Sequence, residues 1–168
     1  MTVREIIFLP DPVLRRKARK VTDFGKDMQQ LIDDMIDTMR VAPGVGLAAP
    51  QIGISQKVIV VEFGNDEVED APLKLYIVVN PEIINSSDES IDGIEACLSV
   101  PGLVGNVERQ EHVVVKGVNR FGEPVKIKAN GWLARIFQHE IDHLNGIVFT
   151  DRAECVWKPE ETETYADV

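Results

Sequence analysis

The sequence predicts one domain that combines helices with antiparallel β-strands. Apolar side chains at helical spacing occupy residues 28–39, and a second helix is indicated at residues 130–146. Residues 103–109, 111–119 and 124–129 alternate in polarity and follow one another closely, as three successive antiparallel strands would. The chain has 168 residues, which is long enough for one domain with a substantial core.

Near the N-terminus, residues 6–9 are predicted to be extended and to end at Pro10 and Pro12, with a turn at residues 13–16. The first helix has apolar residues at intervals of three and one, which places them all on one face. These residues are Met28, Leu31, Ile32, Met35, Ile36 and Met39. We expect Pro43 to end the helix.

Most of the middle of the chain is predicted to be strand. Residues 57–63, 75–80 and 82–85 are rich in Val and Ile, whereas the acidic residues 64–72 and the polar residues 86–92 indicate a loop and a turn. The small residues of the stretch 44–53 favour a tight structural turn, which a second backbone or a ligand can approach closely. A last short strand is expected at residues 147–149.

Charge and composition exclude several classes of protein. The formal net charge of −10 argues against binding to nucleic acid or to an anionic membrane. No apolar run approaches the roughly 20 residues of a membrane helix, and no apolar signal segment begins the chain. Its two cysteines, Cys97 and Cys155, make no disulfide framework. We therefore expect a cytoplasmic protein.

The strongest functional signal is a His-Glu-x-x-His motif in the second helix. His139 and His143 stand one turn apart on the same face, so two imidazoles can bind one metal ion. Glu140 lies beside them as a candidate base, and Asn130 can cap the start of the helix. Two histidines can also simply pack in a core. Here, however, two of only three histidines have ligand spacing next to a glutamate.

Two histidines leave a metal site short of ligands. Cys97 is the best candidate for a third ligand, although a cysteine between apolar residues is by default a small buried hydrophobe. Asp142 is a weaker candidate because it lies off the face of the two histidines, and Cys155 lies beyond the helix without a ligand partner nearby. The motif specifies neither the metal nor the reaction.

Three separated motifs and the opening of the chain together resemble peptide deformylases. They are residues 44–51, residues 95–99, residues 139–143 and the opening Pro10-Asp11-Pro12-Val13-Leu14-Arg15. The resemblance covers nearly the whole chain. It implies an α+β fold in which antiparallel or mixed sheets pack around the metal-binding helix. It also implies a hydrolase that removes the formyl group from the N-terminal formylmethionine of newly made polypeptides and releases formate.

The resemblance also implies roles for particular residues. It assigns three metal ligands: Cys97, His139 and His143. Water would take the fourth place on an Fe²⁺ ion, for which Zn²⁺, Ni²⁺ or Co²⁺ could substitute. Glu140 would take the proton of that water and deliver it to the leaving amine. The backbone N–H of Leu98 and the side-chain amide of Gln51 would hydrogen-bond the developing oxyanion.

Substrate binding is assigned to residues from three parts of the chain: Val45, Gly46, Ala96, Trp132, Arg135 and Ile136. Gly46 would let the peptide backbone come close, and Val45 would help line the pocket for the methionine side chain. We expect the stem of Arg135 at the mouth of that pocket, with its guanidinium in water. Ala96 stands where the family usually has glycine, so the bound peptide is expected to sit slightly differently.

The domain is expected to span residues 1–153, and residues 154–168 are expected to form a short, acidic, flexible tail. The expected partners are N-formylmethionyl peptides and, transiently, the ribosome. Some relatives contact the ribosome through a basic C-terminal helix, and the acidic tail argues against that mode of docking here.

Two other functions were compared with deformylation. A zinc endopeptidase would share the His-Glu-x-x-His motif. Such enzymes usually have a histidine or a carboxylate as third ligand, and the candidate here is Cys97. A metal-stabilised binding module without turnover would lack the base or the oxyanion donor. Glu140 and Gln51 are both present, which favours an active enzyme.

Overall fold

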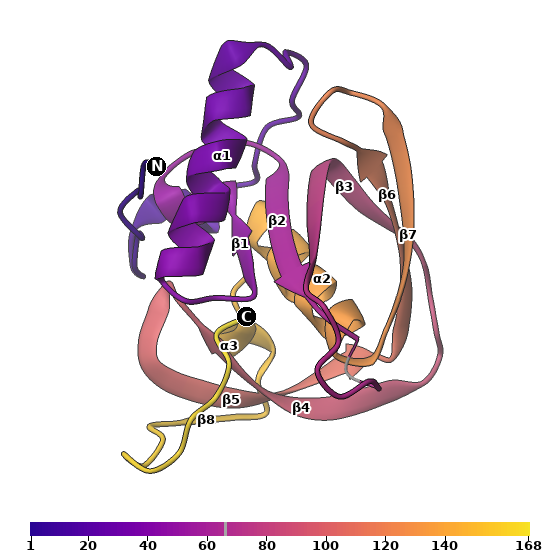
Figure 1. Cartoon of the computed structure of the whole chain (residues 1–168). Helices are drawn as coiled ribbons and strands as arrows, with labels where there is room; N and C mark the ends of the chain where they lie inside the picture. Colours follow the sequence, from indigo (N-terminus) through magenta and orange to yellow (C-terminus); the bar gives the residue numbers. More distant parts are fainter. Residues whose placement is uncertain (66) are drawn as a thin grey trace.

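The computed structural model describes residues 1–65 and 67–168 (Figure 1). Its helices are η1 (Pro12–Arg15), α1 (Lys26–Val41), η2 (Ala49–Ile52), α2 (Gly131–Leu144) and α3 (Phe149–Arg152), where η marks a 3₁₀-helix. Its strands are β1 (Gly46–Ala48), β2 (Val58–Phe63), β3 (Lys74–Ser86), β4 (Ser90–Cys97), β5 (Val100–Gln110), β6 (His112–Val118), β7 (Pro124–Asn130) and β8 (Cys155–Trp157). One antiparallel sheet has the order β1-β2-β3-β6-β7, and the other has the order β4-β5-β8.

The β1 and β2 end of the larger sheet is covered by a helix on each face. Side chains of a strand alternate between the two faces, so β2 contributes to two separate clusters. Ile59 and Val61 belong to the cluster around α2, whereas Val58 and Val60 belong to the cluster around α1. A strand buried on both faces has to be apolar throughout, which explains the continuous Val and Ile run of β2.

Helix α1 confirms the amphipathic pattern of the sequence. All six apolar residues of the predicted stripe are buried, and they lie in the cluster that faces β1 and β2. The helix ends at Val41, two residues before Pro43, as expected. Its buried Asp34 and Thr38 also hold the N-terminal arm, because Arg4 hydrogen-bonds to both side chains.

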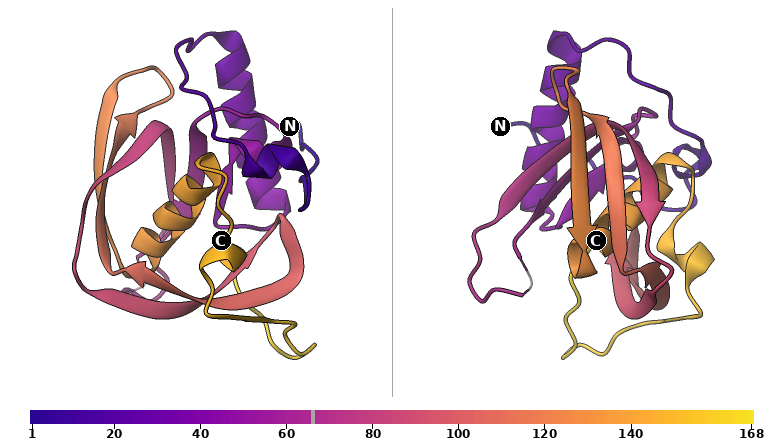
Figure 2. Two further views of the ribbon diagram at one scale, coloured as in Figure 1. Left: turned by 180° about the vertical axis from the view of Figure 1, so that it is seen from behind. Right: turned by 90° about the vertical axis from the view of Figure 1, so that its right-hand side faces the viewer.

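Helix α2 lies between the two sheets (Figure 2). It contacts β1, β2, β3, β6 and β7 of the larger sheet on one side and β5 of the smaller sheet on another. Every residue of α2 from Ala134 to Leu144 is buried, so both of its predicted stripes are covered. The predicted α+β fold around this helix is confirmed.

Three predicted details of the strands are wrong. The run 103–109 does not pair with 111–119: β5 pairs with β4 and β8, whereas β6 pairs with β3 and β7, so the chain changes sheets between them. Residues 75–80 and 82–85 belong to one strand, β3, with a register shift at Pro81. The strand predicted at 147–149 is absent from the described chain, where the short helix α3 begins at Phe149.

Two further segments differ in part from the prediction. The polar turn expected at 86–92 stops earlier, since β4 begins at Ser90. The stretch 44–53 is more regular than a turn, because it contains β1 and η2. Residue 66 of the predicted acidic loop 64–72 lies outside the described residues.

Two pieces of the predicted tail pair with the rest of the chain. Strand β8 pairs with β5 at Val104, Gly105 and Asn106. At the other end, Asp167 bridges to Ala96, and Val168 is fully buried. These two segments of the predicted tail are therefore not loose. Among the described residues, no helix combines the length and the apolar character needed to cross a membrane.

Candidate active site

Three side chains from two elements bring their donor atoms together at the centre of the molecule. Cys97 ends β4, and His139 and His143 lie one turn apart on α2. The Sγ atom of Cys97 lies 3.4 Å from Nε2 of His143, which lies 3.2 Å from Nε2 of His139. All three side chains are buried, and their donor atoms lie within 4.8 Å of one another. Such a set of donors can hold a single metal ion.

The ring of His139 is oriented by a buried carboxylate. Its Nδ1 lies 2.8 Å from Oε1 of Glu95, two residues before Cys97 on β4. Arg109 donates two hydrogen bonds to the same carboxylate, at 2.9 Å each. Burial raises the pKa of Glu95, but the bonds from Arg109 and His139 outweigh it and hold the pKa well below the usual range. The ionised carboxylate accepts from Nδ1–H, which leaves the Nε2 lone pair free for a metal.

Arg109 also belongs to a second group of charged side chains, which is centred on Asp142. Arg109 also donates to Asp142 at 2.6 Å, and Arg152 donates two bonds to that aspartate. Asp142 is therefore a partner of arginines and not part of the donor set, in line with its position off the histidine face. For Arg109, only a position at the end of a strand was predicted.

Glu140 lies next to the donor cluster without a hydrogen-bond partner. Among the described residues, nothing bonds to either carboxylate oxygen, although the side chain is fully buried. Burial first, and then the negative charge of Glu95, raise the pKa of Glu140 well above its usual value. A Cβ on Gly46 would lie only 2.8 Å from Oε1 of Glu140, so the glycine gives this carboxylate its space. An unpaired carboxylate of high proton affinity is suited to general-base chemistry.

The side-chain amide of Gln51 points at the same cluster. Its Oε1 accepts a bond from the backbone N–H of Ala48 at 2.9 Å, which fixes which end of the amide faces inward. Its Nε2 lies 3.2 Å from Oγ of Ser99 and 3.7 Å from Sγ of Cys97. Leu98 lies in the turn between β4 and β5, directly after Cys97. Ser99 is a hydrogen-bond partner of the Gln51 amide, and no role was predicted for it from the sequence.

The charge states of the two ligands around Glu140 follow from burial. Burial, followed by the neighbouring His139, lowers the pKa of His143 well below its usual value, so its imidazole is neutral. Burial and the carboxylate of Glu140 raise the pKa of the Cys97 thiol. A neutral imidazole is ready to bind a metal, whereas the thiol must lose its proton as the ion binds.

The expected placement of Arg135 is wrong. Its guanidinium is buried and lies away from water, with only 2% of the residue exposed. It donates to Oε2 of Glu95 at 2.6 Å and to the backbone carbonyls of Val107 and Ile91. The carboxylate of Glu95 makes the burial of this guanidinium possible. Glu95 is distant in sequence, so the pattern of α2 alone could not indicate it as the partner of Arg135.

Three of the other predicted substrate residues belong to one hydrophobic cluster. Ile136 is a buried member of it, and Val45 and Trp132 pack against it. Ala96, next to the ligand Cys97, accepts a hydrogen bond through its carbonyl from the N–H of Val168. The end of the chain therefore shares this cluster, which the sequence did not indicate.

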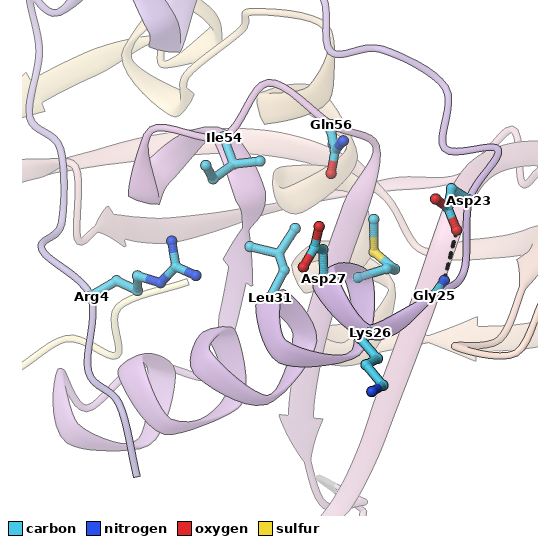
Figure 3. Close-up of a pocket in the computed structure, with 9 residues that line it drawn as sticks. Arg4, Asp23, Gly25, Lys26, Asp27, Leu31, Ile54 and Gln56 are labelled. Carbon is cyan, nitrogen blue, oxygen red and sulfur yellow. Dashed lines mark hydrogen bonds between the residues drawn. The ribbon is translucent and has the colours of Figure 1, made fainter.

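The hollow of about 470 Å³ beside the start of α1 is a different feature (Figure 3). Its lining consists of Arg4, Asp23, Gly25, Lys26, Asp27, Met28, Leu31, Ile54 and Gln56. None of these residues belongs to the Cys97, His139 and His143 donor set or to the Glu95 network, so this hollow is separate from the candidate site on α2.

A buried Cys-His-His donor set with an adjacent unpaired glutamate, on a helix between two antiparallel sheets, defines a metal-dependent hydrolase. Three comparisons make this more specific. The polypeptide deformylase family model matches residues 3–158 of the chain. A peptide deformylase from Natranaerobius thermophilus is 51% identical over 162 residues, which cover 96% of this chain and 99% of that relative.

Solved structures agree with the sequence comparison. The chain superposes on a peptide deformylase from Legionella pneumophila with a TM-score of 0.83 and 46% identity, covering 91% of this chain and 87% of that one. A class I type b peptide deformylase from Acinetobacter baumannii, with Met-Ala-Ser bound, gives a TM-score of 0.83 at 42% identity and covers 90% and 98% of the two chains. The chain belongs to the polypeptide deformylase family. Its reaction is removal of the N-formyl group from newly made polypeptides.

Proposed function

We propose that Cys97, His139 and His143 hold one metal ion, Fe²⁺ in the working enzyme, and that the residues around them deformylate N-formylmethionyl peptides in the cytoplasm. The observation that supports this most strongly is the convergence of the three donor atoms within 4.8 Å, beside an unpaired glutamate. When bound, the ion supplies a Lewis acid that polarises a carbonyl group and acidifies water.

The proton transfers are the task of Glu140. Its carboxylate has no competing hydrogen bond among the described residues, so it is free to accept a proton from the attacking water. The protonated acid then delivers that proton to the leaving amine. The small size of Gly46 keeps this carboxylate in place and allows the peptide backbone to come close.

The oxyanion that develops on the formyl group is bound by two donors. The Nε2 amide of Gln51 is fixed by the N–H of Ala48 at its other end, so it is oriented before the substrate arrives. We assign the second donor to the backbone N–H of Leu98. The hydrophobic cluster of Val45, Trp132 and Ile136 holds the methionine side chain, and Ala96 contributes its backbone at the edge of this pocket.

Turnover of formyl-Met-Ala-Ser by the Glu140→Gln variant tests the assignment. The amide cannot take a proton, so kcat should fall by at least about 10²-fold while metal content stays at the wild-type level. Glu69→Gln, the same change at an exposed position, should keep full activity. Retention of more than about a tenth of the rate by Glu140→Gln with normal metal would overturn the role of this residue.

The identity of the ion is tested separately, because two imidazoles and one thiolate also suit zinc. Turnover per metal ion should be much higher for protein loaded anaerobically with iron than for the zinc form. The iron form should lose activity in air, whereas nickel or cobalt forms should be active and stable in air. Equal rates with zinc and iron would contradict the ferrous assignment.

Transient contact with the ribosome completes the proposal, since the substrate is a growing polypeptide. Residues 154–168 are acidic and Asp167 bridges to Ala96, so we expect the contact to use another part of the surface. Cosedimentation of the protein with translating ribosomes at low and high salt would detect this contact. Absence of cosedimentation at low salt would contradict it.

A further inference from the structure

The last two residues of the chain are hydrogen-bonded to both sides of the active site. The N–H of Val168 donates to the carbonyl of Ala96 at 2.9 Å, one residue before the ligand Cys97. The carbonyl of Asp167 accepts from the N–H of Val45 at 3.1 Å, one residue before Gly46. The end of the chain thus runs beside β4 in parallel and joins β4 to the entry of β1.

The side chain of Val168 is completely buried, with 0% of the residue exposed. It belongs to the same hydrophobic cluster as Ile136, against which Val45 and Trp132 pack. These are the residues to which the proposed function assigns the methionine side chain. Val168 therefore occupies part of the apolar cluster that the proposed function assigns to the substrate.

The connection from β8 to this point is exposed for most of its length. Between β8 and Asp167, only Pro159 and Tyr165 are partly covered. Figure 1 shows the yellow segment leaving β8 at the edge of the molecule and returning to its centre. The segment is thus held at its two ends, by three residue pairs at β8 and by two backbone hydrogen bonds at Asp167 and Val168.

We propose that the C-terminal segment Asp167–Val168 is an internal competitor, which occupies the methionine pocket and its flanking backbone groups until a formylated peptide displaces it. This inference rests on the proposed function, because it needs the cluster of Val45, Trp132 and Ile136 to be the substrate pocket. The tether through β8 keeps the segment at a high effective concentration, although few contacts hold it. It raises the apparent KM and leaves the chemical step unchanged.

Kinetics of three variants loaded with the same metal test the proposal. A chain that ends at Lys158 keeps β8 and lacks the competitor, and Val168→Asp places a charge that the apolar pocket rejects. Both should lower KM for formyl-Met-Ala-Ser by at least about five-fold with kcat unchanged. Ala166→Asp, the same charge at an exposed neighbour, should match the wild type. A KM that is unchanged or raised in the shortened chain overturns the proposal.

Hydrogen exchange separates this proposal from the assignment of activity. The amide of Val168 should be protected in the full-length chain and should exchange at least about ten-fold faster when Met-Ala-Ser is added, because the tripeptide releases the segment. If no metal form deformylates the test peptide, the proposed function fails, and the exchange experiment still reports on the segment. Unchanged protection of Val168 at saturating Met-Ala-Ser overturns the competitor.

Discussion

Glu95 and Glu140 are both fully buried within one site, and their surroundings differ in nearly every respect. Glu95 bonds to His139 and to two buried arginines, Arg109 and Arg135. Glu140 has no hydrogen-bond partner among the described residues. These surroundings move the two pKa values in opposite directions. One glutamate therefore stabilises the structure, and the other has no structural partner among the described residues, which suits the proton transfers proposed for it.

This contrast predicts opposite effects of one substitution on stability. Glu95→Gln leaves the buried guanidinium of Arg135 without its counter-charge and leaves Arg109 with Asp142 as its remaining carboxylate, which should lower the free energy of unfolding by about 3–5 kcal/mol. Glu140→Gln replaces a buried side chain that has no hydrogen-bond partner among the described residues, so the free energy of unfolding should stay within about 1 kcal/mol of wild type or rise. Urea unfolding of both variants with the same metal measures this difference. A comparable loss from Glu140→Gln would contradict this account.

The donor atoms of the site could be predicted from the sequence more fully than their supporting residues. His139 and His143 are related by the local geometry of a helix, which the spacing of the motif reports. Cys97 was inferred as the third ligand because few other donors were available. Glu95 and Arg135 are 40 positions apart, and their 2.6 Å contact follows from the packing of β4 against α2. No local pattern in the sequence encodes such a pair.

At the scale of elements, the spacing of apolar residues predicted which face of a helix or strand is buried. It did not identify the element that packs or pairs with it. The stripe of α1 and the apolar run of β2 are local properties, and both predictions are confirmed. The alternation of residues 103–109 and 111–119 was equally clear, yet β5 and β6 join different sheets. Alternation specifies the two faces of a strand, and its neighbour depends on the rest of the fold.

The N-terminal arm is attached to α1 through a buried carboxylate, which leads to a prediction about pH. Asp34 accepts bonds from Arg4 at 2.8 Å and from Gln30 at 2.7 Å. Burial raises the pKa of Asp34, but these bonds outweigh it and lower the pKa below its usual value of 3.8. The stabilisation is therefore present above about pH 4 and lost as pH falls through the lowered pKa.

Asp34→Asn should reduce the free energy of unfolding at pH 7 by about 1.5–3 kcal/mol, because a charged hydrogen-bond partner of Arg4 is lost. The difference from wild type should shrink as pH is lowered from about 5 towards 2. Asp33→Asn is a matched control: its exposed pair with Arg120 should contribute less than about 1 kcal/mol. A pH-independent difference for Asp34→Asn would show that the carboxylate acts through its shape alone.

At the scale of the whole molecule, the proposed metal ion would add a further link between the smaller sheet and α2, which the Glu95 network already joins. Cys97 belongs to the smaller sheet, whereas His139 and His143 belong to the helix that packs on the larger sheet. Helix α1 and the far face of β2 contribute no donor to the site. A bound ion should therefore stabilise the junction of β4 with α2 more than the α1 face.

Removal of the metal should lower the melting temperature by roughly 8–16 °C. An ion present at a thousand times its Kd adds about 4 kcal/mol to the free energy of unfolding. Each kcal/mol shifts the melting temperature of a domain of this size by about 2–4 °C. Cys97→Ala should reproduce the shift without chelator, whereas Cys155→Ala, at an exposed position, should not. Hydrogen exchange of the metal-free protein should accelerate at β4 and α2 and change little in α1. The proposed ion would connect only β4 and α2. Uniform acceleration across all three elements would therefore show that it stabilises the fold as one unit and not this junction.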